Sequence, residues 1–334
     1  MGATNRVIVV CGESALRAIR CHRRRYARLD WDPLSAAEQR RLLAAGIPNA
    51  GHIDWDALAI AGVWSEGEPL HVLAGDEHRT HGYDPLVCHS TRVDLPKGSI
   101  MRVGANVYAT SPALTSAQLG TCRSYGWLRG LLEELTGAIS LSEIDGAALP
   151  CEPILSPKEL QAQLGRLSKI SGVKRARDVA KYVLGSARSP MEAIMYGVFT
   201  TPMSKGGLGC LNGEPNQRVA LTARAEAVAR MPYVICDLLY KNAGKTLEYN
   251  GVYHATDDAR KHDERRTAGL AAMGIGTIPI NNEILANQDA LTGIAQVIWR
   301  SEGRQFRIRV RDYWQKQRRL LNELRSWCNL PPIR

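Results

Sequence analysis

Three short apolar runs decide the fold of the second half of the chain: YVICDLLY (residues 233–240), KTLEY (245–249) and GTIPI (276–280). Each run is rich in Val, Ile, Leu or Tyr and is bounded by glycine or polar residues, which is typical of buried β-strands. Asp237 follows the apolar residues of the first run, and Glu248 lies within the second. A hairpin between these strands would place the two carboxylates side by side.

The elements on either side extend this pattern. Ser189-Pro190 begins a helix, Val219–Thr222 reads as a strand, and a charged helix is expected over Asp257–Met273. The predicted order from Ser189 onward is therefore helix, strand, strand, strand, helix, strand. Paired carboxylates at a sheet edge supply the oxygen ligands that Mg²⁺ or Mn²⁺ prefers, and such ions promote phosphodiester hydrolysis.

The segment from Ser189 to Ile280 resembles the DUF559 group of endonuclease-like domains. That group is similar to the very-short-patch-repair (Vsr-type) mismatch endonucleases of the PD-(D/E)XK superfamily. The resemblance rests on several motifs that occur in the family's order, namely CDLLY (236–240), LEYNGVYH (247–254), DERR (263–266) and the small-residue turn at 270–274.

The resemblance implies a mixed sheet flanked by helices and a metal site held by Asp237 and Glu248. It also implies that Glu192, on the first helix, points toward the metal. Ser189 and Glu192 match a capping box, which explains the same pair structurally, and one residue can serve both purposes. The superfamily's lysine is missing two positions after Glu248, where Asn250 stands. Asn250 can orient a water molecule but brings no charge.

Other polar residues are candidates for catalysis or for contacts with nucleic acid. His254 follows a glycine turn and is either a general base or phosphate ligand, or an ordinary surface histidine. Arg266 either pairs with Asp263 along one helix or holds a phosphate. Lys245 lies three positions before Glu248 and could replace the missing lysine only if the strand is bulged. Lys174 and Arg175 belong to a basic segment that enters a helix.

The composition fits a nucleic-acid-binding protein. The chain has 334 residues, a net charge of +10 and a pI near 9.3, and this positive charge favours an anionic partner. The eight cysteines form no C-x-x-C pair, so neither a zinc knuckle nor a redox motif is indicated. We expect no signal peptide and no membrane span, and therefore a cytoplasmic protein.

The chain is expected to be of the mixed α/β class, with three parts. Residues 1–170 form a separate α/β region of regulatory or target-selecting role, residues 171–300 form the nuclease-like domain, and residues 301–334 form a basic tail. The segment VYATSP (107–112), followed by a helix, is similar to the region before the nuclease-like domain in AbiEi-like proteins, which are related to antitoxins and transcription regulators.

The sequence thus predicts a Mg²⁺-dependent (or Mn²⁺-dependent) DNA endonuclease in defence or repair, with RNA as an open alternative substrate. The main rival is a catalytically inactive nuclease fold that binds DNA as a regulator or antitoxin-like factor, which the presence of Asn250 supports. A third interpretation is an interaction protein whose positive charge is incidental.

Overall fold

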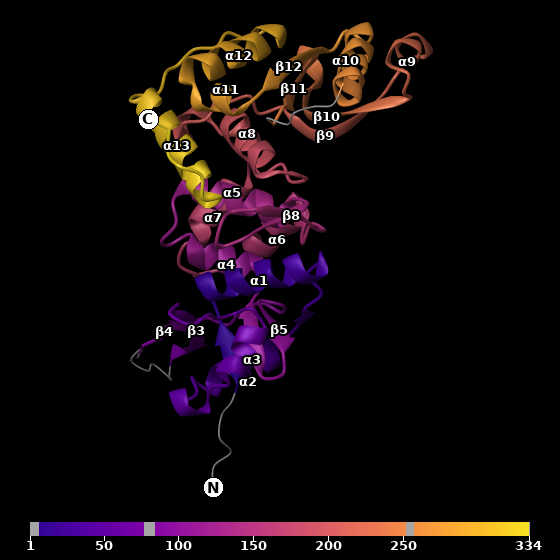
Figure 1. Cartoon of the computed structure of the whole chain (residues 1–334). Coiled ribbons are helices and arrows are strands. Elements are labelled where there is room, and N and C mark those ends of the chain that lie inside the picture. Colours follow the sequence, from indigo (N-terminus) through magenta and orange to yellow (C-terminus); the bar gives the residue numbers. More distant parts are fainter. Residues whose placement is uncertain (1–6, 77–83, 252–256, 334) are drawn as a thin grey trace. The chain divides into compact units, whose positions relative to one another are not determined.

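The computed structural model describes residues 7–76, 84–251 and 257–333, and the chain divides into two compact units at Lys181/Tyr182 (Figure 1). Both units contain sheets flanked by helices, so the predicted mixed α/β class is confirmed. The boundary falls later than the predicted end of the first part at residue 170. The basic segment with Lys174 and Arg175 therefore belongs to the first unit and not to the second.

The first unit is built on a six-stranded mixed sheet of order β2-β5-β6-β1-β3-β4. Its strands and the separate pair β7–β8 are β1 (Ile8–Val10), β2 (Asp32–Pro33), β3 (Leu70–Gly75), β4 (Leu86–Thr91), β5 (Ile100–Gly104), β6 (Val107–Thr110), β7 (Ile139–Leu141) and β8 (Ala148–Pro150). Its helices are α1 (Gly12–Tyr26), α2 (Ala36–Ala44), α3 (Trp55–Ile60), α4 (Pro112–Leu119), α5 (Tyr125–Thr136), α6 (Pro157–Arg166) and α7 (Val173–Ala180).

Two arginines of α1, Arg20 and Arg23, are buried in the first unit. Arg20 is buried and forms an ion pair with Glu134, with a 2.7 Å separation between Nη2 and Oε2. The buried Arg23 donates to the carbonyl oxygens of Glu134, Gly137 and Glu152. A buried guanidinium group is tolerated when most of its donors find partners, and here only Nε of Arg23 has none among the described residues. These two arginines therefore tie α1 to the carbonyl and carboxylate groups of the first unit.

The second unit contains a four-stranded mixed sheet of order β12-β11-β10-β9. Strand β10 pairs antiparallel with both β9 and β11, and β11 pairs in parallel with β12. The elements are α8 (Pro190–Thr200), β9 (Glu214–Ala220), α9 (Ala223–Ala229), β10 (Tyr233–Tyr240), β11 (Lys245–Tyr249), α10 (Asp257–Ala272), β12 (Gly276–Ile280), α11 (Asn282–Ala286), α12 (Gln288–Ser301) and α13 (Tyr313–Trp327). The predicted order of helix, three strands, helix and strand is confirmed, with α9 as an addition between two of the strands.

The two faces of this sheet are covered differently. Helix α10 lies on one face, where Leu270 packs into a buried cluster with Val234, Cys236 and Leu239 of β10. Helix α8 lies on the opposite side of the sheet in Figure 1, and α13, from the predicted basic tail, packs against α8. The tail is thus part of the second unit rather than a separate segment. Gly197 permits this packing, because a Cβ there would come within 2.8 Å of the Leu324 side chain.

Candidate functional site

The two predicted metal ligands meet where β10 and β11 stop pairing regularly. The antiparallel register pairs Leu238 with Leu247, and the next positions along each strand are Asp237 and Glu248. At these two positions the carboxylate side chains accept hydrogen bonds from backbone amides of the opposite strand. The Tyr249 amide donates to Asp237 Oδ2 at 2.8 Å, and the Asp237 amide donates to Glu248 Oε1 at 3.4 Å. Each strand therefore holds the carboxylate of the other.

Glu192 reaches the same place from the first turn of α8. The Ser189 hydroxyl accepts from the Glu192 amide at 3.2 Å and donates to Glu192 Oε1, so Ser189 is the N-cap of α8. The other half of the predicted capping box is not formed, because Glu192 Oε2 accepts from the Arg188 amide at 3.1 Å and not from the Ser189 amide. The buried Tyr196 connects this helix to β10, because its hydroxyl donates to the Asp237 carbonyl at 2.9 Å and lies 3.4 Å from Glu192 Oε2. Glu192 thus accepts a bond at the start of α8 and also lies beside Asp237, to which Tyr196 links it.

The three carboxyl groups share a poorly solvated environment. Burial is the main cause that raises the pKa of each of Glu192, Asp237 and Glu248. The negative charge of Asp237 raises the pKa of Glu192 and Glu248 further, and that of Glu248 reaches about 7. The site therefore concentrates negative charge that a nearby cation would stabilise.

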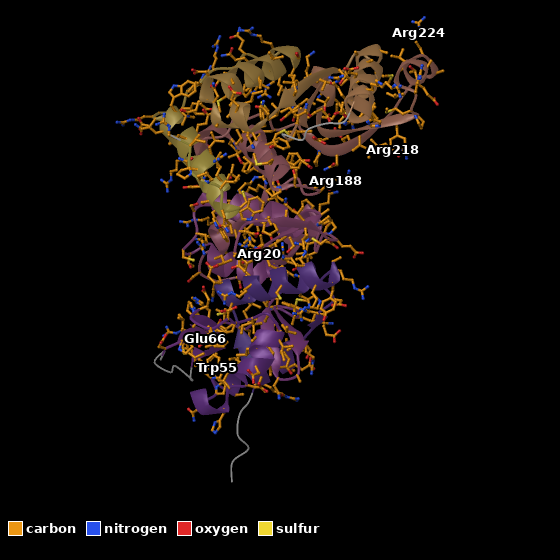
Figure 2. All side chains as sticks on the ribbon, in the orientation of Figure 1. Arg20, Trp55, Glu66, Arg188, Arg218 and Arg224 are labelled. Atoms are coloured by element: carbon orange, nitrogen blue, oxygen red, sulfur yellow. The ribbon has the colours of Figure 1, made fainter. Side chains whose placement is uncertain are left out.

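Two arginines supply positive charge at this site. Arg266 on α10 donates to Glu248 Oε2 at 3.0 Å and to the Ile235 carbonyl at 2.8 Å, while its pairing with Asp263 is longer, at 3.6 Å. Arg188, just before α8, opposes the burial-driven rise in the pKa of Asp237. Its exposed guanidinium has no hydrogen-bond partner among the described residues (Figure 2). Arg188 is thus a cation available to a ligand, whereas Arg266 is occupied.

Replacing Arg266 is expected to destabilise the second unit in a pH-dependent way. Arg266→Met keeps the aliphatic stem but leaves the buried Glu248 carboxylate without its partner, which costs about 2 kcal/mol of unfolding free energy at pH 8. At pH 5 Glu248 is protonated, so the loss should be smaller. Chemical denaturation at the two pH values measures this difference, and an equal loss at both would show that Arg266 acts through packing alone.

The remaining predicted residues lie apart from the carboxylates or outside the described part of the chain. Asn250 is exposed at the end of β11, and its backbone N–H donates to the Ile280 carbonyl. His254 lies outside the described residues. Lys174 and Arg175 are exposed on α7 of the first unit, where Arg175 donates to the Arg123 carbonyl. These positions leave Glu192, Asp237 and Glu248, with Arg266, as the predicted residues that come together.

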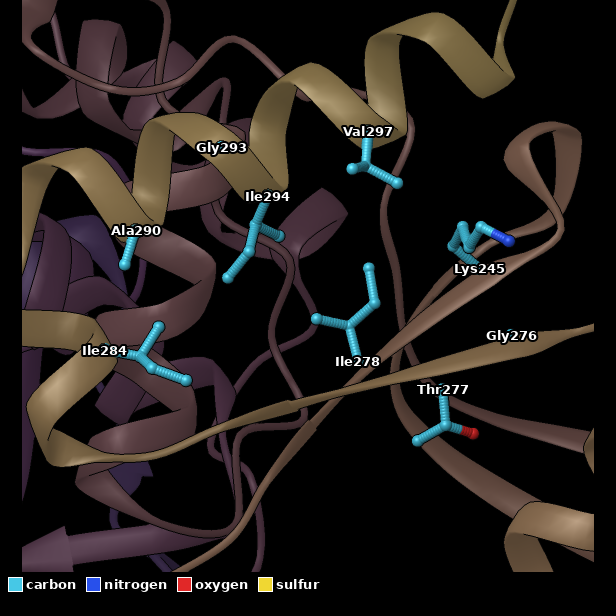
Figure 3. Close-up of a pocket in the computed structure, with 9 residues that line it drawn as sticks. All are labelled: Lys245, Gly276, Thr277, Ile278, Ile284, Ala290, Gly293, Ile294 and Val297. Atoms are coloured by element: carbon cyan, nitrogen blue, oxygen red, sulfur yellow. The ribbon is translucent and has the colours of Figure 1, made fainter.

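Lys245 lies at the other end of β11 from the pair of acids. It begins the strand, opposite Tyr240 on one side and Gly276 on the other. Three strand residues span about 10 Å, so Lys245 does not replace the missing lysine. It lines an apolar cavity of about 510 Å³ between β12 and α12, together with Ile278 and Ile294 (Figure 3).

The donor atoms at the acidic site match a hard divalent cation in kind, since they are carboxylate oxygens. Asp237 Oδ1 has no protein donor among the described residues. Glu248 is engaged by Thr246 at 2.6 Å and by Arg266, and no three His, Cys, Asp or Glu side chains in the described ranges form a metal-holding group. The chemistry of the site fits Mg²⁺ or Mn²⁺, but the Glu248–Arg266 contact competes with a metal for the same oxygen.

Two contributors to the site were missed in the sequence. Arg188 belongs to no sequence motif, and its electrostatic effect on Asp237 depends on how α8 packs. Tyr196 lies four residues after Glu192, a spacing that puts both on one helix face and could have marked it. The residues around Tyr196 in the sequence are apolar, which is typical of a core residue without a polar role.

No helix among the described residues is long and apolar enough to cross a membrane. No protein-family model, curated protein or solved structure matches this chain.

Proposed function

We propose that the second unit is a Mg²⁺-dependent or Mn²⁺-dependent nuclease that hydrolyses phosphodiester bonds of DNA in the cytoplasm, in defence or repair. The observation that carries this proposal is the buried acidic pair Asp237–Glu248, cross-bonded between two strands with Glu192 beside it. A protein gains nothing in stability from burying like charges, so such a cluster is typical of a site that binds a cation or moves a proton.

In this proposal Asp237, Glu248 and Glu192 hold the metal ion. Such an ion, when bound, would polarise the scissile phosphate and activate a water molecule. Arg188 stabilises negative charge on the phosphate and so supplies the charge that Asn250 lacks. Asn250, exposed at the strand end, orients water through its amide group. Arg266 would have to give up Glu248 Oε2 for that oxygen to serve as a metal ligand, and its guanidinium could then contact a phosphate.

Metal-dependent nicking of supercoiled plasmid DNA tests this proposal. The purified full chain should convert supercoiled to open-circular DNA with Mg²⁺ or Mn²⁺ and should stop when EDTA is added. Ca²⁺ serves as the comparison ion, because it is larger and binds with looser geometry. If neither Mg²⁺ nor Mn²⁺ produces nicking of plasmid, linear duplex or single-stranded DNA, the proposal is wrong.

One observation favours the rival function, a nuclease fold kept for DNA binding and regulation. The ion pair between Arg266 and Glu248 satisfies the acid without a metal. If this is its permanent partner, DNA affinity should be the same in EDTA and in Mg²⁺, and no DNA should be cleaved. A Mg²⁺-dependent increase in affinity that is lost in Asp237→Asn would instead favour the nuclease.

A further inference from the structure

We infer that the open face of β9 and β10 binds a single strand of DNA, with Tyr233 as a platform for an unpaired base and Arg218 as its phosphate contact. This inference rests on the proposed function and names the form of the substrate. It concerns residues outside the acidic site.

The strand register shows which side chains share this face. Tyr233 pairs with Ala220 and Ile235 pairs with Arg218, and paired residues of antiparallel strands point to the same side of the sheet. Val234 and its partner Val219 point to the opposite side, where they pack in the cluster beneath α10. Tyr233, Ile235 and Arg218 therefore lie on the face that α10 does not cover.

Arg218 and Tyr233 stack on each other on this face. The Arg218 guanidinium lies over the Tyr233 ring, with Cζ 3.9 Å from the ring centroid, although both side chains are exposed and Tyr233 retains 38% of its surface. Arg218 has no acidic partner among the described residues. A cation held flat on an aromatic ring keeps its N–H donors free for phosphate, and it offers a stacked surface to a base.

The position of this pair relative to the acidic site suits a strand that runs along β10. Ile235, opposite Arg218, is two residues before Asp237, which corresponds to about 7 Å along the strand. At the acidic end of this path the charge of Arg188, just before α8, opposes the burial-driven rise in the pKa of Asp237. Cations thus flank the route to the carboxylates, and their charge complements a phosphate backbone.

Stacking on Tyr233 selects for single-stranded DNA. Bases in an intact duplex stack on one another and present only their edges, so an exposed ring on a sheet can stack only with an unpaired base. Sheet faces that carry aromatic residues and arginines bind single strands in this way without reading their sequence.

Fluorescence anisotropy in EDTA tests the inference without cleavage. A labelled dT oligonucleotide is compared with an abasic oligonucleotide of equal length, which has the same phosphates but no bases. Tyr233→Ala should weaken dT binding about tenfold and leave abasic binding unchanged, whereas Tyr233→Phe should keep the wild-type affinity. Arg218→Ala should weaken both and lower the salt dependence by about one counterion.

Arg224 provides a matched control. It is an exposed arginine on α9, without a partner among the described residues, and Figure 2 shows it projecting from that helix. Arg224→Ala removes the same charge and should leave the base-dependent difference intact. Thermal melting checks that Tyr233→Ala folds, and Tyr233→Phe supplies an independent result if it does not.

Several results would overturn the inference. One is that Tyr233→Ala weakens dT and abasic binding equally. Another is that the protein binds blunt duplex more tightly than the single strand. A third is that Tyr233→Ala weakens binding of an rU oligonucleotide but not of dT. Failure of the proposed function is separate: base-dependent binding without metal-dependent cleavage would contradict the nuclease, and cleavage without base-dependent binding would contradict this surface.

Discussion

Asp237→Asn is expected to lower Mg²⁺-dependent DNA cleavage by roughly a thousandfold or more, which is the scale of losing a main electrostatic contributor at an active site. Asparagine keeps the size of the side chain and one acceptor oxygen, so the hydrogen bond from the Tyr249 amide is retained. The change removes the negative charge, and with it one of the proposed metal ligands.

Initial rates of plasmid nicking across a Mg²⁺ titration measure this effect. Asp289→Asn is the matched control, because Asp289 lies in the first turn of α12 and not at the acidic pair. Melting curves of both variants show whether the fold is kept. A wild-type cleavage rate in Asp237→Asn would mean that the activity, if present, resides elsewhere in the chain.

Glu248→Gln is expected to raise the free energy of unfolding at pH 8 in EDTA by up to about 3 kcal/mol. The pKa of Glu248 rises from 4.5 to about 7 in the folded chain, chiefly because of burial and secondly because of the Asp237 charge. Above pH 7 the wild-type protein must keep an ionised carboxylate in a place that disfavours it. Glutamine removes that charge and keeps an oxygen that can accept from Thr246.

The direction of the pH dependence follows from proton binding. Between pH 4.5 and pH 7 the folded state holds a proton on Glu248 that the unfolded state has released, so wild-type stability falls as the pH rises through this range. Glu248→Gln should lack this proton-linked change, so its free energy of unfolding should vary less with pH. Urea denaturation at several pH values measures it, with unfolding of the two units followed separately.

Glu283→Gln provides the comparison for this experiment, since Glu283 is an exposed acid in the first turn of α11. It should change stability by only a few tenths of a kcal/mol. Lower stability of Glu248→Gln than of wild type at pH 8 would show that the Arg266 ion pair outweighs the cost of burial. Addition of Mg²⁺ should narrow the gap between wild type and Glu248→Gln if the ion binds the carboxylate.

The sequence by itself determined the strands that carry the acidic pair. The apolar runs around Asp237 and Glu248 alternate and end in turns strongly enough to predict β10, β11 and β12, and the charged segment between them predicts α10. Ser189 predicted the start of α8 because an N-cap bond is a local interaction. Local hydrogen bonding and hydrophobic periodicity need no knowledge of the rest of the chain.

Strand β9 was decided by tertiary structure. Its observed range begins at Glu214 and includes Pro215, whereas the sequence predicted a strand only from Val219. Proline is tolerated because β9 is the edge strand of the sheet, where one row of amides needs no partner. Pairing with β10 supplies the bonds that local propensity does not predict.

The partners of the charged residues could not be predicted from the sequence either. The i,i+3 spacing of Asp263 and Arg266 predicted a helical ion pair, but the shorter contact of Arg266 is with Glu248 on another element. Arg188, which no motif marks, opposes the burial-driven rise in the pKa of Asp237, whereas Lys245 lies at the other end of β11. Charge pairing between distant elements depends on how helices pack on the sheet, and that packing is set by the whole core rather than by any one segment.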